Sequence, residues 1–464
     1  LPLTLLALCS YVIAGGSAIM SRFIVRPVQI GLTGSIGMGK SAASLHFKTL
    51  GFPVFDADQV VHSLYSVGGK AVSPVQTLWP DAIVDGAVNR KKLSEKLLQD
   101  ADSLKILESI VHPLVAEERK LFYETAISTG VLAVIYDIPL LLENRSSYEV
   151  DYVAVVTASE ETQKHRVMKR PGMTAEKFQL ILSKQMPDAQ KRALADFIIN
   201  TDYPSKAQAK AQIANMIESI VEERPQLWQQ WKQRTVSTMS KAVSPSRVDS
   251  ESVLADHFDL IAFDLDMTLA DSNIPVHHAE DMLFNYMDVH MPRTAVLARS
   301  NMKTKMNELR TEQPLIKHNL GELRKEALRS LCMSIDAIEE ESKIENAIEL
   351  FIQERSSIDP YLYSDSLPCL EYLSKISNMK LCILTNGNAD IVHAPQLNQY
   401  ITQSITAGDI GIWKPKATPF IALSQILNIS PSRILFIGDH HYYDCIGAKN
   451  AGMITCWLNR SGEE

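Results

Sequence analysis

Short apolar runs alternate with longer amphipathic stretches along the chain, and the alternation occurs in two separate series. In the first series, helical spacing extends over residues 41–49 and most of residues 60–130. The apolar runs that predict its buried strands cover residues 28–32, 53–55, 131–136 and 151–157. Strands that alternate with helices predict a doubly wound parallel sheet. A second apolar run at residues 258–263 starts a new series, so the sequence predicts an α/β chain with two such folds.

The segment between the two series has a different composition. From about residue 222 to residue 257 the chain loses the alternation and becomes rich in Gln, Ser, Lys and Pro. Such a change is typical of a linker. We therefore expect a first domain at residues 22–224, a linker at residues 225–256 and a second domain at residues 257–464. Trp228 and Trp231 are expected to close the last helix onto the first domain.

The opening segment, residues 1–21, is apolar and carries no charge before Arg22. It approaches the length that spans a bilayer but lacks the basic start of a secretory signal. Three interpretations remain open: the functional chain starts near Met20, the segment is a membrane anchor or signal, or it is an organellar leader. Membrane association is expected only through this segment. We expect a cytoplasmic protein, with a mitochondrial or membrane-anchored one as the alternative.

Charge and cysteine content limit the classes of function. The 464 residues include 46 basic and 54 acidic side chains, a formal charge of −8. This balance argues against a surface that coats nucleic acid, and no nucleic-acid partner is expected. The six cysteines form no Cys-x-x-Cys pair, so the sequence predicts neither a zinc site nor a disulfide framework. A reducing compartment follows from that pattern.

A glycine-rich segment between the first strand and the first helix contains a complete phosphate-binding motif. Its residues are Gly34, Ser35, Ile36, Gly37, Met38, Gly39, Lys40 and Ser41, which we call the phosphate-binding loop. Glycines let the backbone N–H groups surround a phosphate, and the next helix directs its N-terminus at the same anion. Lys40 can reach the outer phosphates, and the Ser41 hydroxyl can ligate Mg²⁺. The sequence predicts ATP and Mg²⁺ here; the alternative is an ordinary flexible glycine turn.

Further candidates follow the loop. Asp56 and Asp58 come at the carboxyl end of a short strand, where parallel sheets bind ligands. Asp58 is the candidate base for a hydroxyl nucleophile, unless it only caps the next helix. Asp56 is a Mg²⁺-water ligand or a structural partner. Arg166 and Arg170, four apart on a predicted helix, would neutralise the transferred phosphoryl group unless they form a solvated basic face.

The motifs of this first series resemble, in order, those of the dephospho-CoA kinase family from about residue 28 to residue 220. They read GLTGSIGMGKS, GFPVFDAD, VVHSLY, VHPLV, DIPLLLE, DYVAVVTASEETQKHRVMKR, ILSKQM and KRALADFIIN. The resemblance implies transfer of the ATP γ-phosphate to the ribose 3′-hydroxyl of dephospho-CoA. The sequence departs from the family at Ser35, Met38 and Pro171. His112 would touch substrate or only pack at a helix end. Another P-loop nucleoside or nucleotide kinase is the alternative, whereas the base-reading motif of guanine-nucleotide switches is missing from the sequence.

The second series carries four motifs that resemble those of the haloacid-dehalogenase superfamily of phosphatases, over about residues 258–459. They are FDLDMT, LTNG, WKP and FIGDHHYYD. In this chemistry the carboxylate of Asp264 attacks phosphorus, and Asp266 protonates the leaving oxygen and later activates water. Thr385 and Lys414 neutralise the phosphate. The expected Mg²⁺ ligands are Asp264, Asp266, Asp439 and Asp444.

The resemblance also implies a Rossmann-like domain with a cap. Residues 273–360 are helical and rich in charge, and an insertion at this place closes over substrate in the superfamily. His277 and His278 are expected to be exposed polar residues, and His440 and His441 to point away from Mg²⁺. The substrate is an unidentified phosphomonoester. The alternative is a regulatory domain without turnover.

Overall fold

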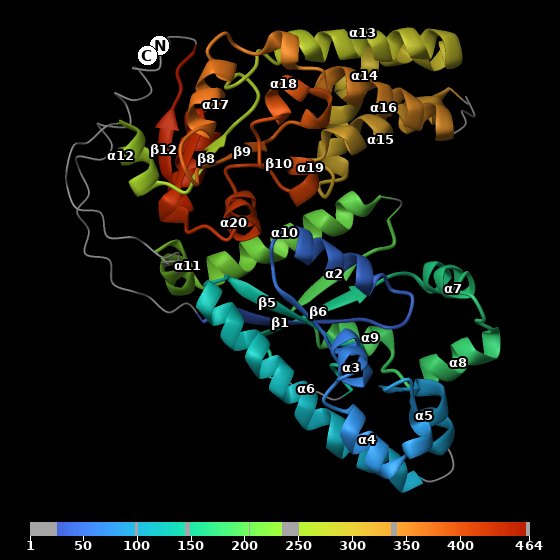
Figure 1. Cartoon of the computed structure of the whole chain (residues 1–464). Coiled ribbons are helices and arrows are strands. Elements are labelled where there is room, and N and C mark those ends of the chain that lie inside the picture. Colours follow the sequence, from blue (N-terminus) through green and yellow to red (C-terminus); the bar gives the residue numbers. More distant parts are fainter. Residues whose placement is uncertain are drawn as a thin grey trace. The chain divides into compact units, whose positions relative to one another are not determined.

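The computed structural model describes residues 26–97, 101–143, 149–203, 205–233, 250–335 and 341–460. They form two compact units, a first unit of residues 24–202 and a second unit of residues 203–464 (Figure 1). The apolar segment 1–21 and residues 234–249 of the predicted linker lie outside the described residues. Of the helices in the described part of the chain, none is long and apolar enough to cross a membrane.

The first unit contains a five-stranded sheet in the order β2-β5-β1-β6-β7, in which every pairing is parallel. Its strands are β1 (Val28–Thr33), β2 (Val54–Asp56), β5 (Ala133–Asp137), β6 (Tyr152–Thr157) and β7 (Phe197–Asn200). Helices cover both faces, which explains why the central strands are buried along almost their whole length. The predicted doubly wound parallel sheet is confirmed.

The helices of the first unit are α2 (Lys40–Thr49), α3 (Ala57–Tyr65), α4 (Val72–Leu78), α5 (Arg90–Leu97), α6 (Ala101–Thr129), α7 (Glu160–Met168), α8 (Ala175–Ser183) and α9 (Asp188–Ala193). The stretch with the predicted helical pattern, residues 60–130, is interrupted by a hairpin of β3 (Ile83–Val84) and β4 (Ala87–Val88). A turn at Asp85 and Gly86, both with positive φ, explains this break. His112 was expected at a helix end, but it is an exposed residue inside α6, because α6 continues through Pro113.

The second unit has its own five-stranded parallel sheet, in the order β10-β9-β8-β11-β12. Its strands are β8 (Leu260–Phe263), β9 (Lys380–Thr385), β10 (Gln403–Thr406), β11 (Ile434–Gly438) and β12 (Ile454–Trp457). Helices around it are α12 (Ser250–His257), α17 (Ser366–Ser374), α18 (Pro395–Asn398), α19 (Ala407–Ile410), α20 (Ala417–Ile426) and α21 (Gly447–Asn450), with one π-helical turn, η6 (His441–Ile446).

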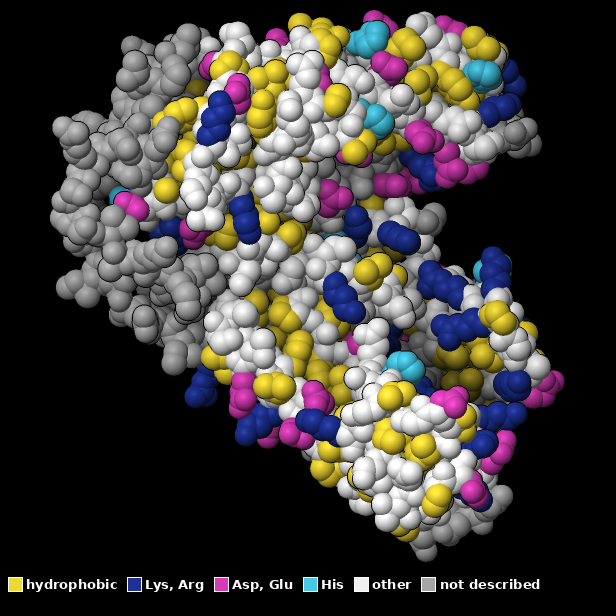
Figure 2. All heavy atoms as spheres, in the orientation of Figure 1, with side chains coloured by type: hydrophobic (Ala, Val, Ile, Leu, Met, Phe, Trp, Pro, Cys, Tyr) yellow, Lys and Arg dark blue, Asp and Glu magenta, His cyan; other side chains and the backbone are white. Residues whose placement is uncertain are grey.

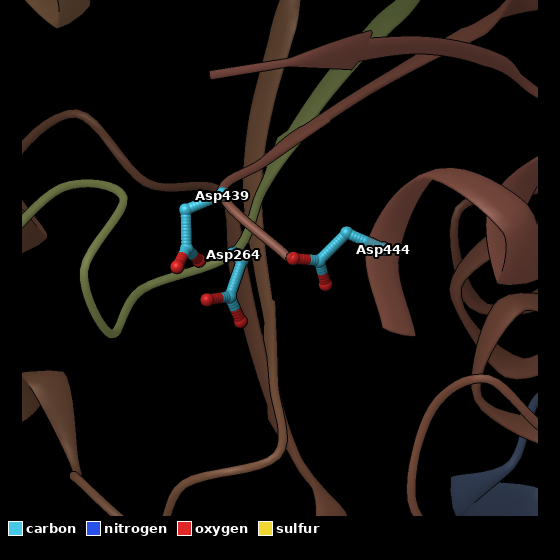
Figure 3. Close-up of side chains that lie close together, drawn as sticks. All are labelled: Asp264, Asp439 and Asp444. Atoms are coloured by element: carbon cyan, nitrogen blue, oxygen red, sulfur yellow. The ribbon is translucent and has the colours of Figure 1, made fainter. Parts of the chain in front are cut away.

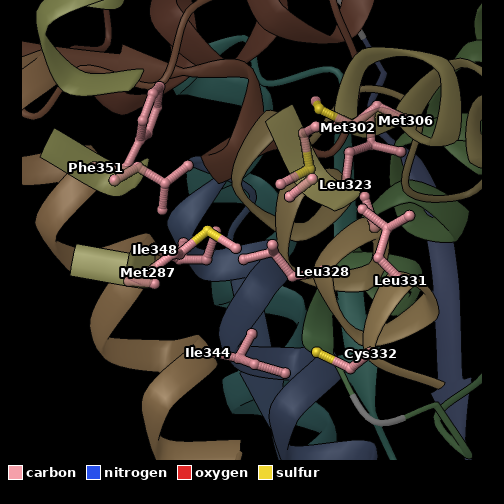
Figure 4. Packing of buried hydrophobic residues seen from close by; sticks show 14 of the residues in the cluster. Met287, Met302, Met306, Leu323, Leu328, Leu331, Cys332, Ile344, Ile348 and Phe351 are labelled. Atoms are coloured by element: carbon pink, nitrogen blue, oxygen red, sulfur yellow. The ribbon is translucent and has the colours of Figure 1, made fainter. Parts of the chain in front are cut away.

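The insertion after β8 is helical, as the sequence predicted. It consists of α13 (Asn273–His290), α14 (Pro292–Glu312), α15 (Leu320–Ser334) and α16 (Glu341–Ser356). We call these helices the cap. They have a hydrophobic core of their own, in which Met287, Leu328 and Ile348 pack together (Figure 4).

Two helices that precede the predicted second domain belong to the second unit. These are α10 (Lys206–Glu223) and α11 (Pro225–Lys232). α10 packs against α19 and α20. Trp231 is fully buried and stacks on Trp228 with ring centroids 5.0 Å apart. The sequence associated both tryptophans with the first domain, but their helix groups with the second unit.

Candidate functional site

The phosphate-binding loop joins β1 to α2 at the carboxyl edge of the first sheet. Gly37 and Gly39 have φ values of 80° and 91°, a left-handed backbone that other residues rarely adopt. A Cβ on Gly37 would come within 2.5 Å of a Val167 methyl group, and one on Gly39 within 2.8 Å of the Thr201 hydroxyl. Both glycines are therefore required by conformation and by space.

Side chains from distant segments hold this loop. Gln163 donates its amide to the Ile36 carbonyl at 2.8 Å, and the Ile36 N–H donates to Gln185 at 3.1 Å. Met38 is buried and its carbonyl accepts the Thr201 hydroxyl at 2.7 Å. The loop conformation is thus fixed by residues of α7 and of the segments after α8 and β7.

Acidic residues line the same edge. The Lys40 ammonium forms an ion pair with Asp137, a buried carboxylate at the end of β5. Asp56 ends the neighbouring strand β2 and lies directly opposite Asp137 in the register. The sequence placed Asp137 at a strand end but gave it no role, so the structure adds it to the site.

Asp56 and Asp58 have different local positions. The Asp56 carboxylate caps α3 by accepting the Gln59 N–H at 3.0 Å. Asp58 lies in the first turn of that helix and is exposed. The interpretation of Asp58 as the cap is therefore wrong, because Asp56 fills that position. Asp58 remains the candidate base.

The two arginines expected four apart on one helix, Arg166 and Arg170, do not share a helical face. α7 ends at Met168, since Pro171 and Gly172 follow in a turn, and Arg170 lies beyond the helix. Arg166 donates to the Thr201 hydroxyl at 2.9 Å and to the Thr201 carbonyl at 2.7 Å, beside the phosphate-binding loop. Basic side chains gather over α7 in Figure 2, and Lys164 and Arg170 are exposed there.

In the second unit, three carboxylates converge at the carboxyl ends of β8 and β11. Asp264, Asp439 and Asp444 each offer an oxygen within 4.8 Å of the others (Figure 3). Buried Lys414 donates to Asp264 at 2.7 Å and to Asp444 at 2.6 Å. Gly438 leaves room for this arrangement, because a Cβ there would collide with the Asp444 side chain.

Burial dominates the electrostatics of this cluster. It raises the pKa of Asp264 to about 8, against the opposing effect of Lys414, and it also raises the pKa of Asp439. For Lys414, burial acts to lower the pKa, but the two carboxylates outweigh it and the pKa is raised. Protons therefore compete with any cation for these oxygens near neutral pH.

Asp266 lies outside the carboxylate cluster. Its carboxylate accepts hydrogen bonds from Ser272 and Arg355, and from the Thr385 hydroxyl at 3.2 Å. The group of oxygens within 4.8 Å of one another consists of Asp264, Asp439 and Asp444, and Asp266 as a metal ligand stays a prediction. Arg355 comes from the last turn of α16 in the cap, and no motif in the sequence pointed to it.

Other residues that the sequence missed hold the predicted ones in position. The Asn386 side chain accepts the Lys414 N–H at 2.8 Å and donates to its carbonyl at 3.2 Å. Thr268, fully buried, accepts the Asp439 N–H at 3.0 Å and bonds its carboxylate at 3.2 Å. Both residues stand inside the quoted motifs, so their position was a usable signal.

Three of the histidines considered above lie at the starts of helical segments. His440 accepts the N–H groups of Tyr442 and Tyr443 through Nδ1, at 3.2 and 3.3 Å, so its side chain caps η6. The expectation that His440 and His441 point away from Mg²⁺ stays a prediction. His277 and His278 are exposed at the start of α13, as expected.

The donor set of the second unit suits magnesium. Asp264, Asp439 and Asp444 supply only oxygen atoms, the ligands that hard cations prefer. The residues therefore fit the Mg²⁺ that the sequence predicted.

Comparisons with known proteins identify both units. Residues 28–206 match the family model described as dephospho-CoA kinase. The dephospho-CoA kinase of Rhizobium meliloti (strain 1021) is 50% identical over 174 residues, which are 38% of this chain and 89% of that protein. The chain belongs to the dephospho-CoA kinase family. The dephospho-CoA kinase of Novosphingobium aromaticivorans is 44% identical over 202 residues, 44% of this chain and 99% of that protein.

The dephospho-CoA kinase domain is followed by a second domain of another family. Residues 258–452 match the model described as haloacid dehalogenase-like hydrolase. A solved 2-haloacid dehalogenase from Pseudomonas syringae pv. Tomato DC3000 is 28% identical, with a TM-score of 0.41, and the match covers 45% of this chain and 89% of that one. Both predicted families are confirmed. We refer below to the kinase domain and the hydrolase domain. The helices α10, α11 and α12 lie between the two matches. The exception is Lys206, the first residue of α10 and the last residue of the kinase match.

Proposed function

We propose that the kinase domain transfers the γ-phosphate of ATP to the ribose 3′-hydroxyl of dephospho-CoA. The observation that carries this proposal is the convergence of Lys40, Asp137 and the carboxylate pair of β2 and α3 at one sheet edge, beside the phosphate-binding loop. The family membership supplies the identity of the two substrates.

Each side chain has a distinct role in this proposal. Residues 34–41 hold the ATP phosphates, and the Lys40 ammonium stabilises the charge on the outer phosphates. Arg166, anchored beside the loop by Thr201, neutralises the transferred phosphoryl group. Asp58 accepts the proton of the attacking hydroxyl, for which its exposure at the sheet edge leaves it accessible. Ser41 is the protein ligand of the Mg²⁺ that accompanies ATP.

Substitution of Lys40 tests this proposal. Lys40→Ala should abolish formation of coenzyme A, because the ammonium that stabilises the outer phosphates is lost, while the variant remains folded although it also loses the ion pair with Asp137. Lys48→Ala, at the exposed end of the same helix, is the matched control and should keep full activity. If Lys40→Ala retained most of the wild-type kcat, the loop would not be the site of phosphate transfer.

We also propose that the hydrolase domain cleaves phosphomonoesters. Asp264 attacks phosphorus and forms an aspartyl phosphate, while Asp266 gives a proton to the departing ester oxygen. Asp266 then takes a proton from water, which hydrolyses the aspartyl phosphate to inorganic phosphate and restores Asp264. Thr385 and Lys414 hold the phosphate oxygens. When bound by Asp264, Asp439 and Asp444, Mg²⁺ supplies positive charge that stabilises the phosphoryl oxygens.

The buried contact of Lys414 with Asp264 and Asp444 supports this second proposal, since it gathers the nucleophile, a cation and the metal ligands in one place. The test is Mg²⁺-dependent release of phosphate from p-nitrophenyl phosphate and from a panel of natural phosphomonoesters by the full chain. If no compound is hydrolysed, the regulatory alternative gains support instead.

A further inference from the structure

The hydroxyl of Thr201, the residue directly after β7, contacts two separate parts of the kinase site. It donates to the Met38 carbonyl at 2.7 Å and accepts Nη1 of Arg166 at 2.9 Å. Its other possible acceptor, the Thr157 carbonyl, is more distant, at 3.3 Å. Because a hydroxyl has a single proton, donation to Met38 leaves its lone pairs for Arg166. One oxygen atom therefore connects the phosphate-binding loop to the guanidinium on α7.

The Arg166 guanidinium is held at more than this one point. Its Nη2 donates to the Thr201 carbonyl at 2.7 Å, and Nη1 lies 3.5 Å from the Gly37 carbonyl of the loop. Both oxygens of Thr201 thus bind the same edge of a planar group, which fixes the direction of the remaining N–H groups. Nε and the second N–H of Nη2 have no hydrogen bond to a described residue, and the side chain is only partly buried. These groups are suited to a phosphate oxygen beside the loop.

Thr201 itself is firmly placed. Its backbone N–H donates to the Thr157 carbonyl at 2.8 Å, and a Cβ on Gly39 would come within 2.8 Å of its hydroxyl. The next residue, Asp202, accepts the hydroxyl of Ser159, the N-cap of α7, at 2.8 Å. The segment after β7 is therefore bonded to α7 at its start and at Arg166. Such support matters for catalysis, since a misplacement of about 1 Å can lower a rate about 10²-fold.

We propose that Thr201 is a positioning residue of the kinase reaction. Its hydroxyl holds the Arg166 guanidinium against the phosphate-binding loop, so that the remaining N–H groups of Arg166 meet the transferred phosphoryl group. The inference rests on the proposed kinase function, and in this role Thr201 acts through Arg166 rather than on a substrate. The competing role is support of the loop through Met38 alone, which would weaken ATP binding instead of slowing the transfer.

Steady-state kinetics of the full chain, with coenzyme A formation as the readout, separates the two roles. Thr201→Val removes the hydroxyl and keeps the branched shape. It should lower kcat about tenfold, the usual effect of losing one hydrogen bond to a charged group, and leave both KM values within about twofold. Thr201→Ser should restore kcat to within about threefold of the wild type, because its hydroxyl can make the same two bonds. Thr201→Ala is a second removal of the hydroxyl, in case the valine variant does not fold.

A control and a double-mutant cycle complete the test. Thr125→Val should keep wild-type kinetics, since the Thr125 hydroxyl bonds only the Leu121 carbonyl of its own helix, α6. Arg166→Gln should lower kcat, and the addition of Thr201→Val should then change kcat by less than about twofold. An additive loss in the double variant, or an unchanged kcat in Thr201→Val with or without a higher KM for ATP, would overturn the proposal.

The identity of the acceptor is a separate outcome. The same variants are compared in ATP hydrolysis without dephospho-CoA, in which water takes the phosphoryl group and the products are ADP and inorganic phosphate. A wild-type chain that forms no coenzyme A would refute the proposed function, and the cycle measured on hydrolysis would still decide the role of Thr201. Formation of coenzyme A with additive losses in the cycle would keep the function and refute the inference.

Discussion

Replacement of Glu218 in α10 tests how much the packing of this helix contributes to the stability of the second unit. The residue is buried, and its Oε1 accepts both the backbone N–H and the hydroxyl of Thr418, each at 2.6 Å. Thr418 is in the first turn of α20, only a few residues after Lys414. The carboxylate therefore satisfies an N–H at the start of a helix, as a capping residue does.

The expected loss of stability in Glu218→Ala follows from these bonds. A buried donor that loses its acceptor costs about 1–3 kcal/mol. The Thr418 hydroxyl keeps a weaker acceptor, the Ala214 carbonyl at 3.3 Å, so the two losses together should be about 2–4 kcal/mol. In a unit of this size, each kcal/mol lowers the melting temperature by about 2–4 °C. We expect a decrease of roughly 5–15 °C in the midpoint of the second unit.

Scanning calorimetry of the full chain measures this decrease, and ATP identifies the transition of the kinase domain by raising its midpoint. Glu222→Ala, one turn further along α10, is the matched control, because that side chain is 72% exposed. Glu218→Gln should be intermediate, since an amide oxygen can still accept one bond. An unchanged second-unit midpoint in Glu218→Ala would refute the claim that α10 is an integral part of this unit.

The active-site side chains give three further predictions. Asp58→Asn should keep substrate binding but lower the kinase kcat by about 10²- to 10⁴-fold, the usual effect of losing a general base; a kcat within a few-fold of wild type would move the base elsewhere, first to Asp56. Asp264→Asn should abolish hydrolysis of p-nitrophenyl phosphate and leave coenzyme A formation unchanged, because the contacts of Asp264 lie within the second unit. Loss of both activities would contradict the independence of the two domains. Mg²⁺ should raise the melting temperature of the second unit more at pH 8 than at pH 6, because the raised pKa values of Asp264 and Asp439 let protons displace the cation as the pH falls. Asp439→Asn should weaken this stabilisation. An equal effect of Mg²⁺ at both pH values would argue against this cluster as the Mg²⁺ site.

Local motifs made much of both sites predictable from the sequence. The phosphate-binding loop and the Asp264 motif each contain their chemistry within a few consecutive residues, and apolar strands place those residues at a sheet edge. The loop geometry at Gly37 and Gly39 follows from the same segment. The end of α7 before Arg170 was also predictable, because Pro171 disfavours helix at the preceding residue.

Long-range contacts could not be predicted in this way. Arg355 meets Asp266 across 89 positions of sequence, and Glu218 meets Thr418 across 200. No spacing rule connects such pairs, because the packing of whole helices brings them together. The hydrogen bonds to the Asp266 carboxylate also come from separate segments, since its donors are Ser272, Thr385 and a residue of the cap.

The identity of the product tests the central claim most directly. The full chain is incubated with Mg²⁺, ATP and dephospho-CoA, and the nucleotide products are analysed by mass spectrometry and phosphorus NMR. The proposed kinase function predicts one equivalent of ADP for each coenzyme A, with the new phosphate on the ribose 3′-oxygen. ADP formation without coenzyme A, or phosphate on a different oxygen, would contradict it.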